Sequence, residues 1–331
     1  MLKYIIKRLA LSVLILFCVS LIIFTLIQLM PMDYISTKIA EINSKGEGVT
    51  EETMQAMMNE YGYGTDGTLG GIVKGYFTWL KATLRLDFGN SFKFQQPVAD
   101  VIAKNMWVSF AVAAIATVFE FMIAIPLGIT AATHQYSFRD YFVTVLVMIG
   151  ISLPSFFFGQ ILKNMLAMQL GWFPSSGLGS ATMDYSGVAL ILDYLSYLVI
   201  PVLTVVVLSI GGRMRMTRTN MLEVLGSDYI RTARAKGLSE TKVIYKHAFR
   251  NTLIPLVTSL AGLLPSLFSG AIITEQIFDL PGIGNVALQA MLSADIPFIM
   301  GYNMFLALLS VIGVLLADLT YAIVDPRVKL S

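Results

Sequence analysis

Residues 9–30 form an apolar run of 22 residues without a charged side chain. An α-helix of that length rises about 1.5 Å per residue, so it reaches about 33 Å and matches the hydrocarbon thickness of a bilayer. The apolar part is too long for a signal peptide, and no small-residue cleavage site follows it. We therefore expect a retained membrane span that ends at Pro31.

The composition indicates that most of the chain shares this environment. Hydrophobic residues make up 56% of the 331 residues and charged residues only 13%, whereas a typical soluble domain is about 25% charged. Further apolar stretches long enough to span a bilayer lie at about residues 103–132, 141–166, 190–210, 253–277 and 298–324. The sequence therefore predicts an all-α polytopic membrane protein with six transmembrane helices, the third kinked near residues 150–154.

The other compositional features exclude several classes of function. A net charge of +2 is too small to indicate nucleic-acid binding. Cys18 is the single cysteine, so the chain has no internal disulfide and no cysteine-based metal site.

The distribution of basic residues predicts the orientation. Lys and Arg gather near the N-terminus, at the Arg139 turn, in residues 213–250 and in the C-terminal tail, whereas the loops at 171–185 and 278–297 contain none. Cytoplasmic loops carry an excess of Lys and Arg, so both termini are expected in the cytoplasm. The domains predicted are an N-terminal segment with helix 1 (1–30), an extracytoplasmic insert (31–100) and a core of helices 2–6 (101–331).

The most unusual stretch is a basic loop between helices 4 and 5, at about residues 212–252. Residues 213–250 contain nine Lys or Arg and three Asp or Glu. The segment DYIRTARAK (228–236) consists of helix formers, Gly237 is placed to end that helix in the left-handed conformation, and Ser239 is placed to cap the next helix. Leu238 is expected to fold back towards Ala233. We predict a helix–glycine–helix hairpin in the cytoplasm, rather than a loop whose charges only set topology.

The hairpin offers a surface to another protein. Ala233, Ala235 and Gly237 are small enough for a groove to close over them, and Arg231 and Arg234 are placed to pair with carboxylates of a partner.

This segment resembles the coupling loop in permease subunits of ATP-binding-cassette importers. That family's motif is Glu-Ala-Ala, three residues, Gly, nine residues and Ile-x-Leu-Pro. Gly237 and Ala233 match it, whereas Arg231, Thr232 and HAFR (247–250) depart from it. The departures resemble the oligopeptide/dipeptide/nickel branch, which has DY-x-RTARAKGLS followed by H-x-x-RN.

The resemblance covers nearly the whole chain. Further matching segments are LDFGNSF (86–92), ISLPSF (151–156), GWFPSSG (171–177), FDLPGIG (278–284) and DPR (325–327). PMDY (31–34) departs from the family's Pro-Gly-Asp-Pro, and the long segment before residue 86 is similar to the first of the two permeases in such systems.

The resemblance implies a peptide importer that works by alternating access in a bacterial or archaeal cytoplasmic membrane. The implied partners are a second homologous permease, two ATPase subunits, an extracytoplasmic solute-binding protein and the lipid bilayer. Coupling to the ATPase is implied for Tyr229, Arg231, Thr232, Ala233, Arg234, Ala235, Lys236, Gly237 and Leu238. The chain contains no GxxxxGK[ST] phosphate loop, so we expect ATP and Mg²⁺ to bind the partner ATPases, and we expect no catalytic residue, metal or cofactor in this chain.

Glu120, which lies in mid-membrane, suggests an alternative of another class. Intramembrane carboxylates often mark ion pathways, so an ion-coupled secondary transporter or channel is the competing interpretation. Lys163 and Glu275 lie near span ends, where they are expected to reach the interface, and Asp318 is expected to meet cytoplasmic bases. Glu120 is then the only deep carboxylate. A membrane-embedded enzyme has no support, because the chain contains no HExxH or GxSxG motif.

A Pro/Gly turn in the second outer loop is a further candidate. Its residues are Leu280, Pro281, Gly282 and Gly284. Such a turn keeps a fixed shape near the mouth of a pathway, where it would contact the binding protein or gate the pathway. The competing interpretation is an ordinary tight turn before a short helix.

Overall fold

A computed structural model provides the fold, and it describes residues 2–29, 51–60, 62, 68–180, 185–259 and 262–324. These ranges consist of helices and loops, with one isolated β-bridge between Asn90 and Pro97. The expectation of an all-α protein is confirmed. The PMDY and DPR segments fall outside the described residues.

Four helices are long and apolar enough to cross a membrane. They are α1 (Leu2–Gln28), α5 (Val98–Thr133), α8 (Val188–Leu225) and α15 (Ile296–Val324). A fifth candidate is a pair of helices bent by 99°, in which α6 (Phe138–Ser152) is followed by α7 (Ser155–Leu162) and the π-helix η1 (Lys163–Gln169). The bend lies at the predicted kink, where Pro154 disfavours helical backbone in the residue before it.

The expected count of six spans is not confirmed, because no single helix covers residues 253–277. This stretch contains α11 (Arg250–Ser259), α12 (Leu263–Phe268) and α13 (Ile272–Ile277). The break before α13 includes Gly270, whose φ of +76° favours glycine, and a Cβ there would lie 2.4 Å from the backbone nitrogen of Gly284. Hydropathy does not reveal such a break, since the residues on both sides of it are apolar.

Helix α8 is longer than the predicted fourth span of residues 190–210. Its 38 residues reach about 57 Å at 1.5 Å per residue, and they include the first part of the basic loop. The helix continues because its arginines find acidic partners on neighbouring helices. Arg213 Nε lies 3.0 Å from Glu120 Oε1 on α5, and Arg218 donates to both carboxylate oxygens of Asp140 on α6. These pairings allow charged residues in a membrane helix.

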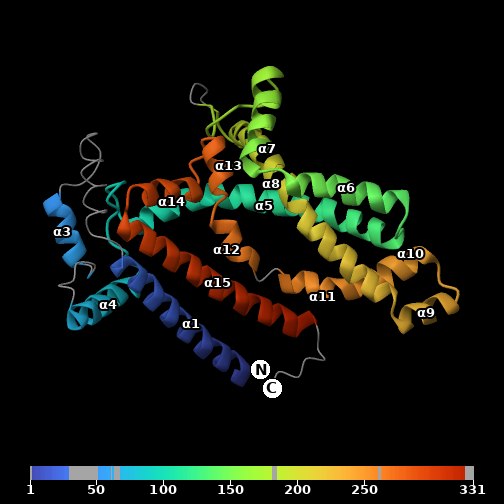
Figure 1. Ribbon diagram of the computed structural model, residues 1–331, viewed down its shortest axis with the longest axis horizontal. Coiled ribbons are helices and arrows are strands. Elements are labelled where there is room, and N and C mark those ends of the chain that lie inside the picture. Colours follow the sequence, from blue (N-terminus) through green and yellow to red (C-terminus); the bar gives the residue numbers. More distant parts are fainter. Residues whose placement is uncertain are drawn as a thin grey trace.

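Helices α5 and α8 form the centre of the molecule (Figure 1). They approach most closely at Gly128, where a Cβ would lie 2.6 Å from Thr217 Cβ and 2.8 Å from the carbonyl oxygen of Met214. Helix α6 packs against α8 in the same way, since a Cβ at Gly211 would meet Ile151 at 2.2 Å. Small residues at such crossings let membrane helices gain van der Waals contact.

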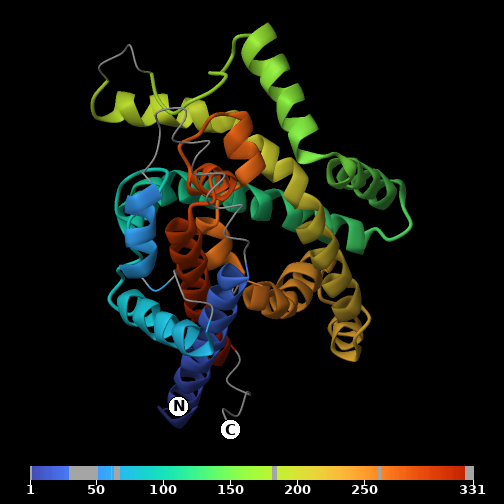
Figure 2. The same ribbon diagram turned by 60° about the vertical axis from the view of Figure 1, so that its left-hand side comes forward.

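Part of the segment after α1 packs on α1. The segment contains α3 (Glu51–Glu60) and α4 (Leu69–Thr83), and Figure 2 shows α4 beside α1. Trp79 and Tyr76 are buried against Phe24 of α1, and the Tyr76 hydroxyl lies 2.8 Å from Ser20 Oγ. Phe77 of α4 is exposed.

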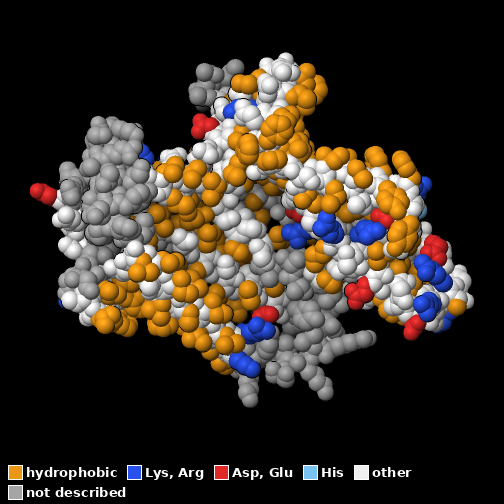
Figure 3. All heavy atoms as spheres, in the orientation of Figure 1, with side chains coloured by type: hydrophobic (Ala, Val, Ile, Leu, Met, Phe, Trp, Pro, Cys, Tyr) orange, Lys and Arg blue, Asp and Glu red, His pale blue; other side chains and the backbone are white. Residues whose placement is uncertain are grey.

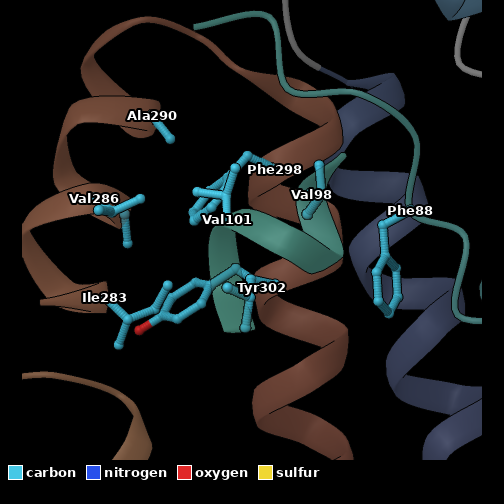
Figure 4. Close-up of a cluster of buried hydrophobic side chains, with 10 residues drawn as sticks. Phe88, Val98, Val101, Ile283, Val286, Ala290, Phe298 and Tyr302 are labelled. Carbon is cyan, nitrogen blue, oxygen red and sulfur yellow. The ribbon is translucent and has the colours of Figure 1, made fainter. Parts of the chain in front are cut away.

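The LDFGNSF segment connects this outer part to the core. Phe88 packs in a buried cluster with Val98 and Val101 of α5, Ile283 of α14 (Ile283–Leu292) and Phe298 of α15 (Figure 4). One cluster therefore holds together segments that are distant in sequence.

A buried carboxylate secures the same corner. Asp295 accepts hydrogen bonds from Ser91 Oγ and from the backbone nitrogens of Lys93 and Phe298. Burial raises the pKa of the Asp295 carboxyl, and these hydrogen bonds oppose that shift.

The beginning of α1 and the end of α15 lie together, as both views show (Figures 1 and 2). Arg8 Nη1 is 3.1 Å from Asp318 Oδ2, so Asp318 meets a base of the N-terminal cluster, as the sequence suggested. This contact supports the expectation that both ends of the chain lie on one side of the membrane.

The α5–α8 crossing yields a testable prediction. Gly128→Ala should lower the free energy of unfolding by about 1–3 kcal/mol, because the added methyl group forces two tightly packed helices apart. Thermal unfolding of the purified protein in detergent measures the effect. The control is Gly212→Ala on α8, where a Cβ meets nothing within 4 Å. An equal loss of stability in both variants would contradict the close approach.

Candidate functional site

The hairpin predicted in the basic loop has the expected local structure. Helix α9 (Asp228–Ala235) is followed by Gly237 with a φ of +74°. Gly237 N–H donates to the carbonyl oxygen of Arg234 at 2.9 Å, and Leu238 N–H donates to that of Ala233 at 3.4 Å. These two bonds define a Schellman motif, which requires a left-handed residue at the position of Gly237. The predicted helix–glycine–helix turn is therefore confirmed.

The second arm of the hairpin begins at the predicted residue. Helix α10 (Glu240–Lys242) continues into the π-helix η2 (Val243–Phe249), and Ser239 occupies the N-cap position, although its side chain makes no capping hydrogen bond. Arg234 Nε donates to Glu240 Oε1 at 2.9 Å and connects the two arms. The pair is exposed, so it contributes little to stability. Arg234, which the sequence suggested would pair with a carboxylate of a partner protein, is therefore already paired within the hairpin.

The hairpin has a hydrophobic core of its own, which it shares with the ends of two membrane helices. Ile230 and Val243 are fully buried, and they pack with Ile129 of α5 and Met221 of α8. Dense apolar packing of this kind transmits displacement with little compression. A force on the hairpin therefore reaches α5 and α8 directly.

The position of Ala233 corrects one expectation. Ala233 belongs to this buried core and is only 7% exposed, because it lies on the same face of α9 as Ile230. It is not available to a partner's groove, and a bulky side chain there would disturb the hairpin's own packing. The exposed candidates are Tyr229, Arg231, Thr232, Arg234, Ala235, Lys236 and Gly237, while Leu238 is half-buried. Figure 3 shows charged side chains gathered at this α9–α10 end of the molecule.

The turn in the second outer loop is built around a buried carboxylate. Glu275 of α13 is fully buried and accepts hydrogen bonds from Ser109 Oγ at 2.6 Å, Ala271 N–H at 3.0 Å and Asn285 N–H at 2.9 Å. Asn285 is in the first turn of α14, so Glu275 also satisfies a helix N-terminus. The expectation that Glu275 reaches the interface is wrong, because its partners lie inside the protein.

Glycine is required beside this carboxylate. A Cβ at Gly282 would lie 2.4 Å from the Glu275 side chain, and a Cβ at Gly284 would lie 2.9 Å from it. Leu280 is fully buried, and Pro281 is the exposed member of the four candidates. The turn is therefore inward-packed, with a small exposed tip.

Hydrogen bonds to backbone carbonyl oxygens connect this turn to the neighbouring motif and to η1. Gly177 N–H of the GWFPSSG segment donates to the carbonyl oxygen of Phe278 at 2.8 Å, and Lys163 Nζ donates to that of Ile277 at 2.7 Å. Lys163 is half-buried and is held to the end of α13 by this bond, and its expected position at the interface stays a prediction.

Glu120, the intramembrane candidate, is 8% exposed and forms the ion pair with Arg213 already described. The guanidinium of Arg213 also lies over the ring of Phe121, 4.6 Å from its centroid. A carboxylate already paired with an arginine is a poor site for binding and releasing a coupling ion, so this geometry does not favour the ion-coupled alternative.

Sequence reasoning missed Arg213 as the partner of Glu120 and Ser109 as a partner of Glu275. The available signal was that each intramembrane charge needs a partner, but the sequence does not say which residue supplies it.

The fold defines a multi-pass membrane protein with a helical hairpin that is packed against two membrane helices. Comparison with known proteins gives the family. Residues 124–330 match the family described as binding-protein-dependent transport system inner membrane component. This chain belongs to that family and is a permease subunit of an ATP-binding-cassette importer, which implies ATPase partners.

Similar proteins extend the match to the full length. The chain is 33% identical to the oligopeptide transport system permease protein AppB of Bacillus subtilis over 330 residues, which cover 99% of this chain and 100% of the relative. It is 36% identical to a putative peptide transport system permease protein of Brucella abortus over 327 residues, 98% of each chain. An inward-facing crystal structure of the MetNI methionine ABC transporter shares the fold, with a TM-score of 0.51 and 16% identity over 68% of this chain and 96% of that chain.

Glu275 provides a prediction for the outer turn. Glu275→Gln should lower the free energy of unfolding by about 1–3 kcal/mol, because the amide group replaces one acceptor oxygen with a donor that faces a buried N–H. Denaturant unfolding in detergent measures this change. Glu223→Gln, an exposed substitution on α8, serves as the control and should be nearly neutral. An unchanged free energy of unfolding in Glu275→Gln would show that the second acceptor oxygen is not needed for stability.

Proposed function

We propose that this chain is one of two homologous permease subunits of a peptide importer in a bacterial or archaeal cytoplasmic membrane. An extracytoplasmic solute-binding protein delivers the peptide, and two ATPase subunits bind and hydrolyse Mg·ATP, so this chain needs no cofactor of its own. Full-length similarity to permeases of oligopeptide and peptide transport systems carries the proposal.

The hairpin is the proposed docking site for an ATPase subunit. Its outward face is polar and basic, and its inward face is packed on α5 and α8. An ATPase that moves the exposed face of α9 therefore moves two membrane helices with it. The long helices can move as rigid bodies between an inward-open and an outward-open state. ATP and peptide would shift the balance between these two states, because each binds one state more tightly than the other.

The segment at residues 68–97 and the turn at Pro281 are together the proposed docking surface for the binding protein. The segment at residues 68–97 packs on α1 and on the corner formed by α14 and α15, and the exposed tip at Pro281 projects from the inward-packed turn. Both belong to the side that the basic-residue distribution assigns to the outside.

The alternative of an ion-coupled transporter predicts a different energy source. Uptake that survives ATP depletion but collapses with a protonophore would support that alternative. The proposed importer requires ATP, and uptake of labelled peptide should persist with a protonophore present.

Coupling can be tested on the outward face of the hairpin. Thr232→Trp should lower ATP-driven peptide uptake at least tenfold, because the indole occupies the space into which the ATPase must fit, while the amount of permease in the membrane stays unchanged. Uptake is measured in proteoliposomes that contain the complete importer and its binding protein.

Thr25→Trp on α1 is the matched control, because Thr25 belongs to neither proposed docking surface. Thr25 and Thr232 are both exposed, and their hydroxyls donate to the carbonyl oxygens of the residues four positions earlier, at 2.7 and 3.0 Å. Normal uptake by Thr232→Trp would remove the hairpin from the docking role, whereas equal losses in both variants would point to a general effect of tryptophan.

A further inference from the structure

Helices α5 and α8 present two different faces to their surroundings. On one face, an apolar groove of about 340 Å³ is lined by residues such as Ile115, Phe119, Leu195 and Val199. On the other face, a cavity of about 230 Å³ lies between α5, α8 and α12 and includes polar side chains. The pair of helices is therefore amphipathic as a unit, which neither helix shows strongly alone.

The polar residues of the cavity follow the helix periodicity. On α8, Ser209 and Arg213 are one turn apart, and on α5 Thr117 and Glu120 are three residues apart. Residues spaced by three or four lie on the same face of a helix. Ser266 of α12 adds a further hydroxyl group to the lining of the cavity. Apolar walls with a few converging polar groups are typical of ligand sites.

The ion pair belongs to this cavity. The side chains of Arg213 and Glu120 are 18% and 11% exposed to solvent, and both line the cavity. In Figure 3 the surface is recessed between α12 and α8, and acidic and basic side chains lie along the α8 edge. Charged residues within membrane segments face the bundle interior or a water-filled cavity, and they mark substrate pathways.

The second ion pair of α8 differs in this respect. Arg218 binds Asp140 of α6 through two hydrogen bonds, at 3.0 and 2.8 Å, and neither residue lines this cavity. The second pair therefore joins α8 to α6 outside this cavity. The chain provides an internal comparison between two ion pairs of α8, only one of which lines the cavity.

We propose that the cavity between α5, α8 and α12 is a section of the peptide pathway, and that the Glu120–Arg213 pair contacts the charged groups of the peptide in transit. A carboxylate and a guanidinium side by side match a zwitterion, because the peptide's ammonium approaches Glu120 and its carboxylate approaches Arg213. The cavity is too small for a whole oligopeptide, so it accommodates one part of the chain at a time. This inference rests on the proposed function.

Labelling of cysteines tests the location. In the assembled importer with its native Cys18 replaced by serine, Ser209→Cys should react with a charged, membrane-impermeant thiol reagent, and a transported peptide with ATP should slow the reaction at least threefold. Thr117→Cys provides a second position in case the first variant does not fold. The control is the unmodified importer, because Cys18 is exposed on the apolar helix α1 and should remain unreactive in lipid.

Substitution of the charges tests their role. Glu120→Gln should reduce peptide uptake at least tenfold and abolish peptide protection of Ser209→Cys, while the amount of assembled importer is unchanged. Asp140→Asn, which also removes a carboxylate paired with an arginine of α8, should retain protection.

The outcomes separate the two proposals. Failure of the importer to take up any peptide would overturn the proposed function. Normal uptake with unreactive or unprotected cysteines at both positions would overturn the pathway assignment alone. Equal losses of protection in Glu120→Gln and Asp140→Asn would show that the ion pair only joins helices.

Discussion

At Gly128, α5 passes so close to α8 that no side chain fits between them. This contact sets the relative position of the two longest helices in the described part of the chain. The hairpin core packs against their C-terminal ends, the Glu120–Arg213 pair bridges them, and the buried turn at Glu275 is anchored to α5 through Ser109. Because membrane helices gain little from the hydrophobic effect against each other, close packing and buried polar contacts determine such an arrangement.

Local sequence signals predicted the parts of this structure that depend on local interactions. The Schellman turn at Gly237 requires a run of helix formers and one glycine, and both are visible within ten residues of sequence. The kink near Pro154 was predictable for the same reason, since proline restricts the residue before it. The angle between α6 and α7 was not predictable, because it depends on how α6 packs on α8.

Contacts between distant residues could not be predicted. Glu275 and Ser109 are 166 positions apart, and Glu120 and Arg213 are 93 apart. Hydropathy placed the end of helix 4 near residue 210 because every arginine counts as unfavourable in a membrane helix. In the structure, Arg213 and Arg218 form ion pairs with carboxylates of other helices, so the helix continues through them. Ala233 was assigned to a partner's groove because its inward orientation depends on α5 and α8, which lie far from it in sequence.

The short helices α12 and α13 have a consequence for the order in which the protein is built. Each contains six residues, about 9 Å of helix, so neither can enter a bilayer as an independent span. The non-helical backbone around Gly270 is tolerated at membrane depth only where protein covers it, and the donors to Glu275 come from α5, the α12–α13 link and α14. The region around Glu275 therefore depends on α5 and α14 for its buried hydrogen bonds, and it is complete only once these helices are in place.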